Sequence, residues 1–115
     1  MPYRVYILLC SDGPYYTGST SDLERRFQQH QEGVNPDAYT YSRRPVKLLW
    51  FSEEVPRYAD ALAFEHQVKG WSRRKKEALM RGDFNAIHEI VKQERKEREK
   101  RASKRIISQN DHTQE

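Results

Sequence analysis

The chain has 115 residues, 36% of them hydrophobic and 33% charged, and its 21 Lys and Arg against 17 Asp and Glu give a net charge of +4. This length allows one small domain. No apolar run approaches the roughly 20 residues needed to span a bilayer, and a single cysteine excludes an internal disulfide framework and a multi-cysteine zinc site. The start of the sequence has no signal-peptide pattern, so we expect a cytoplasmic protein without a membrane segment.

Charged and apolar residues are distributed unevenly along the chain. The last 24 residues contain only three apolar residues and carry a charge of +3, whereas the first 91 residues carry +1 and have an ordinary apolar content. We therefore expect a folded body followed by a charged tail. The expected division is a domain over residues 1–82, an appended charged helix over 83–107 and a disordered tail over 108–115.

The beginning of the chain predicts a β-hairpin followed by a helix. Residues 3–10 are rich in β-branched and aromatic side chains, which is typical of a strand. The Asp-Gly pair at residues 12–13 favours a turn, and residues 15–18 are the returning strand. Ser21 and Glu24 fit a capping box, which predicts a helix over residues 22–32 that ends at Gly33.

The remaining elements follow from periodicity and from the positions of proline and glycine. Residues 35–45 are a polar loop, and residues 46–51 are a third strand, apolar enough to be central in a sheet. Residues 56–74 contain good helix formers, and residues 75–81 either extend this helix or form a separate turn. Asp83 is positioned to cap a last helix. Residues 92–105 alternate Lys and Arg with Glu, so i,i+4 pairs can support a helix there without packing.

The first predicted helix places Arg26 and His30 on the same face as Leu23 and Phe27, at the margin of the core. A guanidinium in that position needs a partner or an anionic ligand. The alternative for Arg26 is a side chain that extends past the apolar edge into solvent. His30 taken alone fits a packed histidine better than a functional one.

Glu65 falls within the apolar stripe of the second predicted helix. A carboxylate in such a place must be paired, hydrogen-bonded or metal-bound. One hard carboxylate can hold Mg²⁺ if waters and phosphate oxygens complete its coordination. A structural ion pair, with Arg26 as a candidate partner, is the alternative, and both remain open at this point.

Basic residues recur in clusters, and residues 39–44 interleave them with tyrosines, as nucleic-acid-binding segments often do. A solvated charged surface is the alternative. The hairpin also carries several tyrosines, each of which, taken singly, is typical of packing in a small core.

In combination these residues resemble the GIY-YIG nuclease domain. The two short motifs are Val5-Tyr6-Ile7 and Tyr16-Thr17-Gly18, and the further matching residues are Arg26, His30 and Glu65. The resemblance covers residues 3–80 and is strongest to the small stand-alone bacterial branch, the YhbQ-like (UPF0213) proteins. The chain departs from the family pattern at three positions. These are Arg4 in place of the glycine of the first motif, Thr17 in place of isoleucine, and Ser19 where some members have lysine. In addition, the asparagine that some members have downstream of the glutamate has no counterpart here.

The resemblance implies an α/β (α+β) fold with a small three-stranded antiparallel sheet flanked by helices, here with an extra C-terminal helix and charged tail. It also implies hydrolysis of phosphodiester bonds in DNA. Tyr6 and Tyr16 would be the paired tyrosines, with Tyr6 favoured as the proton acceptor. Arg26 would hold the scissile phosphate, His30 would assist proton transfer or contact the phosphate, and Glu65 would bind one Mg²⁺ or Mn²⁺ ion. Arg4 is a hypothetical source of the positive charge that the missing lysine would supply.

We therefore expect a metal-dependent DNA endonuclease that acts in repair or on branched or single-stranded DNA. The alternative is a nucleic-acid-binding module with little or no cleavage of its own, which would need a protein partner for activity. The residues expected to contact nucleic acid are Arg25, Arg43, Arg44, Lys69, Arg73 and Arg74.

Overall fold

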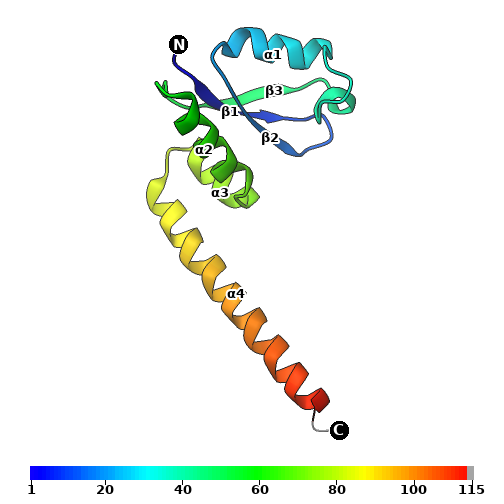
Figure 1. The fold of residues 1–115 in the computed structure, drawn as a ribbon, viewed down its shortest axis with the longest axis vertical. Helices are drawn as coiled ribbons and strands as arrows, with labels where there is room; N and C mark the ends of the chain where they lie inside the picture. The colour runs from blue at the N-terminus through cyan, green and yellow to red at the C-terminus, as the bar shows by residue number, and fades with distance from the viewer. Residues whose placement is uncertain (114–115) are drawn as a thin grey trace. The chain divides into compact units, whose positions relative to one another are not determined.

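The computed structural model describes the backbone of residues 1–113 and the side chains of residues 1–104. The chain divides into two compact units, Met1–Arg73 and Arg74–Glu115. The first unit contains the whole sheet and the two helices that flank it (Figure 1). The expected division of the chain at residues 82 and 107 remains a prediction, and the expected tail over 108–115 lies partly outside the described residues.

The sheet has three antiparallel strands in the order β2-β1-β3, with β1 (Arg4–Leu9) in the centre. β2 (Tyr15–Thr20) follows β1 through a hairpin turn in which Gly13 has a φ of +104°, a conformation that glycine adopts at little cost. β3 (Lys47–Phe51) pairs with the other side of β1. The prediction that this third strand is central was wrong. Its side chains alternate between exposed and half-buried, whereas β1 is buried over residues 5–8.

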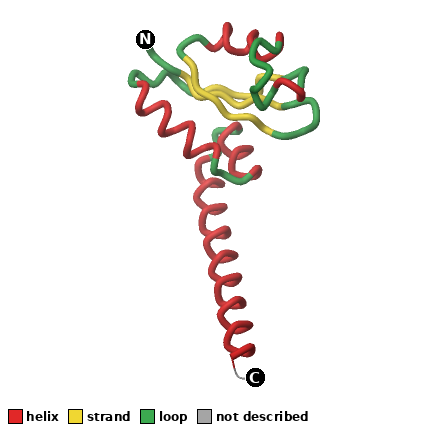
Figure 2. Tube along the Cα trace, turned by 45° about the vertical axis from the view of Figure 1, so that its right-hand side comes forward, coloured by secondary structure: helices red, strands yellow, loops and turns green. Residues whose placement is uncertain are grey.

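α1 (Leu23–Glu32) and α2 (Tyr58–Lys69) lie on opposite faces of the sheet (Figures 1 and 2). Because strand side chains alternate between faces, Tyr6 and Leu8 point to one side of β1 and pack with Leu23 and Phe27 of α1. The side chains of β1 that point to the other side face α2. The sequence prediction of a three-stranded antiparallel sheet flanked by helices is confirmed.

α1 begins one residue later than the capping-box prediction places it. Asp22, rather than Ser21, is the N-cap, and its carboxylate accepts a hydrogen bond of 3.2 Å from the backbone N–H of Arg25. The helix ends at Gly33, which adopts a left-handed conformation with a φ of +68°. The predicted C-terminal glycine cap is confirmed.

The predicted long helix over residues 56–74 is divided in two. α2 ends at Lys69 with Gly70 as its cap, and α3 (Arg73–Met80) is a separate helix. Glycine is a poor helix former, and Gly70 is where the chain leaves α2. The helix formers between residues 58 and 69 were identified correctly, but this break was not.

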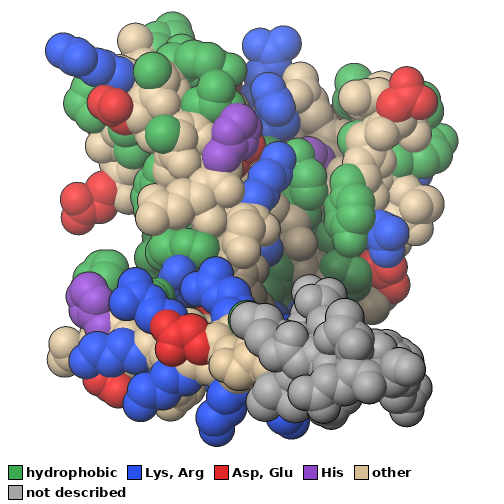
Figure 3. Space-filling model, turned by 60° about the horizontal axis from the view of Figure 1, so that its bottom comes forward, with side chains coloured by type: hydrophobic (Ala, Val, Ile, Leu, Met, Phe, Trp, Pro, Cys, Tyr) green, Lys and Arg blue, Asp and Glu red, His purple; other side chains and the backbone are tan. Residues whose placement is uncertain are grey.

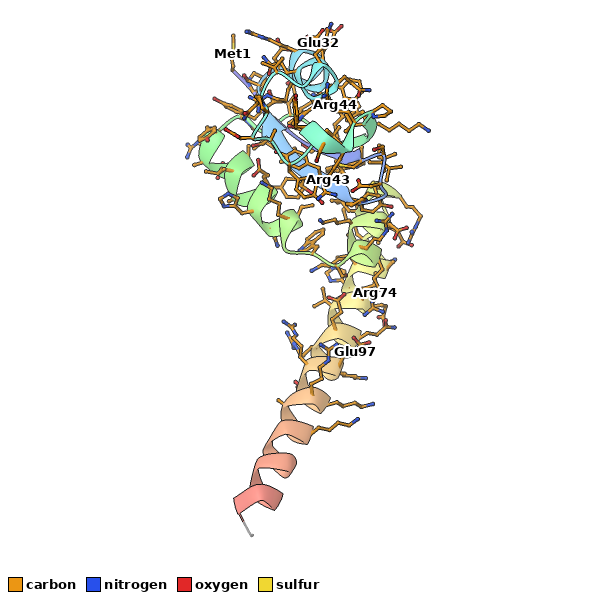
Figure 4. The ribbon with its side chains drawn as sticks, turned by 90° about the vertical axis from the view of Figure 1, so that its right-hand side faces the viewer. Met1, Glu32, Arg43, Arg44, Arg74 and Glu97 are labelled. Carbon is orange, nitrogen blue, oxygen red and sulfur yellow. The ribbon has the colours of Figure 1, made fainter. Side chains whose placement is uncertain are left out.

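The second unit contains the rest of α3 and the long helix α4 (Phe84–Thr113). Asp83 caps α4 through the backbone N–H of Ala86, at 3.0 Å, as predicted. Within this unit Arg74 lies 3.4 Å from Glu94 and 3.7 Å from Glu97, and Figure 4 shows Arg74 near Glu97. Side chains of both charge signs lie close together along α4, in the lower part of Figure 3. Over the described residues, no helix is long and apolar enough to cross a membrane.

Candidate active site

A cavity of about 280 Å³ opens beside α1 and the loop that follows it. Its wall is formed by side chains of β2, of α1 and of residues 33–41. Three of the predicted site residues line it: Tyr16, Arg26 and His30. The fold thus brings a phenol, a guanidinium and an imidazole together in one hollow.

A chain of buried hydrogen bonds runs behind this cavity. The Tyr6 hydroxyl lies 2.9 Å from Nε2 of His30, and Nδ1 of the same ring lies 2.8 Å from Oγ1 of Thr40. All three side chains are buried. The Tyr16 ring also packs against His30, with centroids 5.3 Å apart. His30 is therefore a fixed histidine with a partner on each ring nitrogen, and one edge of it reaches the cavity.

Gly18 provides the space that the Tyr6 ring occupies. The register of the hairpin places Tyr6 opposite Gly18. A Cβ atom at Gly18 would lie 2.4 Å from the Tyr6 hydroxyl and 2.5 Å from Cζ, closer than van der Waals contact permits. The glycine of the second motif is therefore explained by the close approach of a tyrosine from the first.

Burial keeps both Tyr6 and His30 uncharged at neutral pH. Burial, with the nearby Tyr16 as the next contribution, raises the pKa of Tyr6 above its ordinary value, while the charge and hydrogen bond of Arg26 act in the opposite direction. Burial, followed by the positive charge of Arg26, lowers the pKa of His30. Both shifts disfavour the charged form. A buried phenol of raised pKa is a poor proton acceptor, which speaks against the role expected for Tyr6.

Glu65 approaches β2 from the side of α2. Its Oε1 accepts a hydrogen bond of 2.6 Å from the Ser19 hydroxyl, and its Oε2 lies 3.2 Å from Nζ of Lys69. The Glu65 residue is only 8% exposed. Lys69 also lies 5.6 Å from the ring centroid of Tyr16, so this ammonium links the carboxylate to the tyrosine that lines the cavity. Nε2 of His66 also lies 4.0 Å from Oε2. The structure thus pairs Glu65 with Lys69 rather than with Arg26.

The surroundings of Glu65 fit a divalent cation held by one protein carboxylate. Within the part of the chain that the structure describes, no three His, Cys, Asp or Glu side chains gather as a metal-binding group. Mg²⁺ commonly keeps several waters and uses one or two carboxylates together with substrate phosphate. The ammonium of Lys69 beside Oε2 shows that a positive charge is accommodated at this point.

Arg26 is exposed and borders two neighbouring hollows. It lines the cavity with Tyr16, and together with Arg25 it lines a smaller hollow at the N-terminus of α1. Its positive charge also opposes the rise in the pKa of the buried Tyr6 phenol. Arg26 therefore connects the buried hydrogen-bond chain to the surface on which an anionic substrate would lie.

Tyrosines and arginines of the loop before β3 form stacked pairs. The Tyr39 ring stacks on Tyr16 at 6.0 Å, and the Arg43 guanidinium lies 4.3 Å from the Tyr39 centroid. Arg44 lies 4.6 Å from the Tyr41 centroid. The predicted interleaving of aromatic and basic residues is thus a row of cation–π contacts, and it starts at the cavity.

The other basic residues expected at a nucleic-acid interface have separate surroundings. Arg73 lies 3.9 Å from the Tyr15 centroid and donates a hydrogen bond of 2.9 Å to the carbonyl of Gly13. Arg74 belongs to the second unit, where it pairs with α4. Arg4 donates to the carbonyl of Ser52 at 2.7 Å and lies 3.6 Å from Glu54. These contacts assign the charge of Arg4 a structural use and speak against the hypothesis that it replaces the missing lysine.

Sequence reasoning missed two residues of this site. Thr40 was noted only as part of a mixed loop, and a threonine in a polar loop has no periodicity that would mark it as buried. Ser19 was noted as a departure from the family pattern, and its bond to Glu65 is visible only once α2 is placed against β2.

Comparisons with known proteins agree with this geometry. Residues 2–78 match the family model described as the GIY-YIG catalytic domain. A UPF0213 protein of Halalkalibacterium halodurans is 43% identical over 82 residues, which cover 70% of this chain and 83% of the relative. A UPF0213 protein of Syntrophus aciditrophicus is 46% identical over 77 residues, covering 67% and 87%.

A solved structure gives the same result. The NMR structure of a protein from E. faecalis is 32% identical, with a TM-score of 0.51, over 71% of this chain and 85% of that one. Together with the family match and the curated relatives, this similarity assigns the chain to a family. The chain belongs to the GIY-YIG family, in its UPF0213 branch.

Proposed function

We propose that the chain is a cytoplasmic, divalent-metal-dependent endonuclease that hydrolyses phosphodiester bonds in DNA. One observation supports this most strongly. Tyr16, Arg26 and His30 line one cavity, and a buried carboxylate, Glu65, lies close by across β2. The family match to a catalytic domain is consistent with this reading.

Charge stabilisation is the first requirement of the reaction. Phosphodiester hydrolysis develops negative charge on the phosphoryl oxygens, and a guanidinium is suited to contact two of them at once. Arg26 is exposed and lines the cavity. When bound by Glu65, Mg²⁺ or Mn²⁺ would add Lewis-acid stabilisation and lower the pKa of a coordinated water.

Proton transfer and water positioning fall to the residues that reach the cavity. Tyr16 lines it whereas Tyr6 is 1% exposed, so we assign Tyr16 to positioning the attacking water or the phosphate. Tyr6 then serves as a buried support for Arg26 and His30. His30 borders the cavity, but its Nε2 is bonded to the Tyr6 hydroxyl, so a proton accepted by the imidazole would reach it through that hydroxyl.

DNA binding would use the stacked row next to the cavity. Tyr39 and Tyr41 are 46% and 38% exposed, and each carries an arginine over its ring. Exposed aromatic rings can stack on bases while arginines contact phosphates. Unstacked bases are available in branched or single-stranded DNA, so we extend the proposal to the processing of such DNA, as in DNA repair.

A binding module without cleavage is the second candidate, and the contacts of Glu65 favour it. Both carboxylate oxygens are already engaged by Ser19 and Lys69. A metal would have to displace Lys69 to reach Oε2. In this alternative the arginines and tyrosines bind nucleic acid and a protein partner supplies what cleavage requires.

A cleavage assay on labelled substrates separates the two candidates. Single-stranded, duplex, flap and branched DNA, and RNA, are incubated at low salt with Mg²⁺, Mn²⁺ or EDTA. The variants are Glu65→Ala and Tyr6→Phe, and Asp60→Ala is the control because it removes an exposed carboxylate from the same helix.

Metal-dependent cleavage that is lost in Glu65→Ala and kept in Asp60→Ala supports the endonuclease. Tyr6→Phe removes the hydroxyl bonded to His30 and is expected to reduce the rate. Cleavage that persists in both site variants contradicts the proposed site. Salt-sensitive binding without cleavage under any of the metal conditions supports the binding module instead.

A further inference from the structure

Thr40 occupies an unusual place for a residue of a polar surface loop. It is 1% exposed, and its hydroxyl lies 2.8 Å from Nδ1 of His30. The other ring nitrogen of His30 lies 2.9 Å from the Tyr6 hydroxyl. Thr40 thus forms one end of a hydrogen-bond chain that runs through His30 to Tyr6, beside the cavity that Arg26 also lines.

The direction of each hydrogen bond follows from what each group can donate. A guanidinium is positively charged and has only N–H donors. Arg26 borders the same cavity as His30 and its charge acts on the Tyr6 phenol, so the phenol oxygen directs its lone pairs towards Arg26. The single proton of the Tyr6 hydroxyl is then free to point to Nε2 of His30. A neutral imidazole that accepts at Nε2 carries its proton on Nδ1, and that N–H donates to Oγ1 of Thr40.

We propose that Thr40 is a positioning residue that holds His30 in the Nδ1–H tautomer. In this form Nε2 accepts from Tyr6, and the Tyr6 oxygen remains free to accept from Arg26. In the opposite tautomer Nε2–H would donate to the Tyr6 oxygen, and the Tyr6 hydroxyl proton would lose its acceptor on His30. The Thr40 hydroxyl, in the loop after α1, therefore sets which atoms donate and which accept along the chain from His30 to Tyr6, next to the arginine proposed to bind phosphate.

The effect on cleavage rests on the proposed function, whereas the tautomer itself does not. Partners that orient a functional histidine typically change activity by about 10- to 100-fold when removed. We expect a Thr40→Val variant, which keeps the shape of the side chain and loses the hydroxyl, to cleave about 10-fold more slowly. The loss should fall on kcat rather than KM because Thr40→Val keeps the shape of the cavity wall that Thr40 helps to form and removes only the buried hydroxyl bonded to His30.

The full chain offers a matched control at Thr17. The Thr17 hydroxyl is buried and has no hydrogen-bond partner within the described part of the chain. Thr17→Val makes the same chemical change in the same folded unit without removing a hydrogen bond. Thr40→Ser restores the hydroxyl and should return the rate to within about 3-fold of wild type, since the bond to His30 is regained.

Nitrogen NMR of the ¹⁵N-labelled histidine rings provides the direct test. The ring signals of His30 are assigned by their loss in His30→Gln. We expect the wild type, Thr17→Val and Thr40→Ser to show the Nδ1–H form, and Thr40→Val to shift towards Nε2–H. Circular dichroism confirms that each variant is folded, and Thr40→Ala replaces Thr40→Val if valine does not fit.

Two results would overturn the proposal: wild-type His30 in the Nε2–H form, or an Nδ1–H form that persists without the Thr40 hydroxyl. If the tautomer shifts as expected but no variant cleaves DNA, the positioning role stands and the proposed function fails. If cleavage occurs with an unshifted tautomer in Thr40→Val, the endonuclease stands and the role of Thr40 is refuted.

Discussion

Replacing Gly18 with alanine should destabilise the first unit more than any ordinary glycine substitution. The new methyl group would lie 2.4 Å from the Tyr6 hydroxyl and 2.5 Å from Cζ. The ring has little room to retreat because Tyr6 is buried and bonded to His30. Overpacking of a well-packed core costs about 1–3 kcal/mol, and loss of the hydrogen bond to His30 adds about 1 kcal/mol. We therefore expect the free energy of unfolding to fall by about 2–4 kcal/mol.

Urea unfolding followed by tryptophan fluorescence measures this change. Both tryptophans, Trp50 and Trp71, lie in the first unit, so the signal reports on the sheet and its helices. At a slope of about 1.5 kcal/mol per molar urea, the midpoint should fall by about 1.3–2.7 M. The slope itself should stay unchanged, because the surface exposed on unfolding is the same.

Gly70→Ala is the control for this experiment. Gly70 has a φ of −80°, which alanine adopts readily, and a Cβ there would meet its nearest atom at 3.6 Å. We expect its midpoint to stay the same or rise, since replacing glycine at a compatible position stabilises by about 0.4–1 kcal/mol. An unchanged midpoint in Gly18→Ala, or an equal loss in Gly70→Ala, would refute the reasoning from the Tyr6 contact.

Three further predictions test other parts of the molecule. Asp22→Ala should lower the free energy of unfolding by about 1 kcal/mol because it removes the N-cap of α1. The control Ser21→Ala should stay within about 0.5 kcal/mol of wild type, and equal losses of the two variants in urea titrations would contradict the assignment of Asp22 as the cap. Because the pKa of His30 is lowered on folding, the unfolded state binds more protons below pH about 6.5. The free energy of unfolding should therefore decrease as the pH falls below 6.5, and His30 contributes at most about 1.4 kcal/mol per pH unit to this decrease. If the free energy of unfolding of His30→Gln depends on pH as steeply as that of wild type, His30 is not the cause. Lys69→Met should tighten Mg²⁺ binding about 2- to 5-fold, because the metal no longer competes with a half-exposed Lys69–Glu65 ion pair of about 0.5–1 kcal/mol. If Mg²⁺ raises the Tm of this variant no more than it raises the Tm of wild type, the assignment of Glu65 as the ligand is contradicted.

The sequence predicted the features that depend on local pattern. The hairpin follows from the Asp-Gly turn between two β-rich runs, and the end of α1 follows from Gly33, which has a positive φ. The cap of α4 at Asp83 was predicted for the same kind of reason. In each case one or two neighbouring residues determine the structure, so no knowledge of distant contacts was needed.

The features that depend on distant contacts were predicted less well. The apolar run of β3 is compatible with a central or an edge strand, and only its pairing with β1 alone shows that it lies at the edge. Ser21 and Asp22 are both good caps, and the choice depends on which side chain reaches the Arg25 N–H. The break at Gly70 depends on how the chain turns after α2, which composition does not determine.

In the candidate site, too, features with a local sequence pattern were predicted and features that depend on distant contacts were not. Arg26 and Glu65 were singled out because a charge beside or within an apolar stripe demands a partner or a ligand. The structure pairs Glu65 with Lys69, whereas Arg26 is exposed at the cavity. The burial of Tyr6, which shifts the surface role to Tyr16, depends on the packing of α1 over β1. The bond between Thr40 and His30 joins a loop to a helix, and no spacing rule predicts such a pair.

The central claim is that Glu65 is required for cleavage and not for DNA binding. The most direct test measures DNA affinity and the single-turnover cleavage rate of wild type and Glu65→Gln in the same magnesium buffer. Glutamine keeps the shape of the side chain and an oxygen for the Ser19 hydroxyl while removing the charge. We predict that affinity changes by less than about 3-fold while cleavage falls by at least about 100-fold, as loss of a charge-stabilising group at the reaction centre requires. Wild-type cleavage that survives in Glu65→Gln would contradict the account.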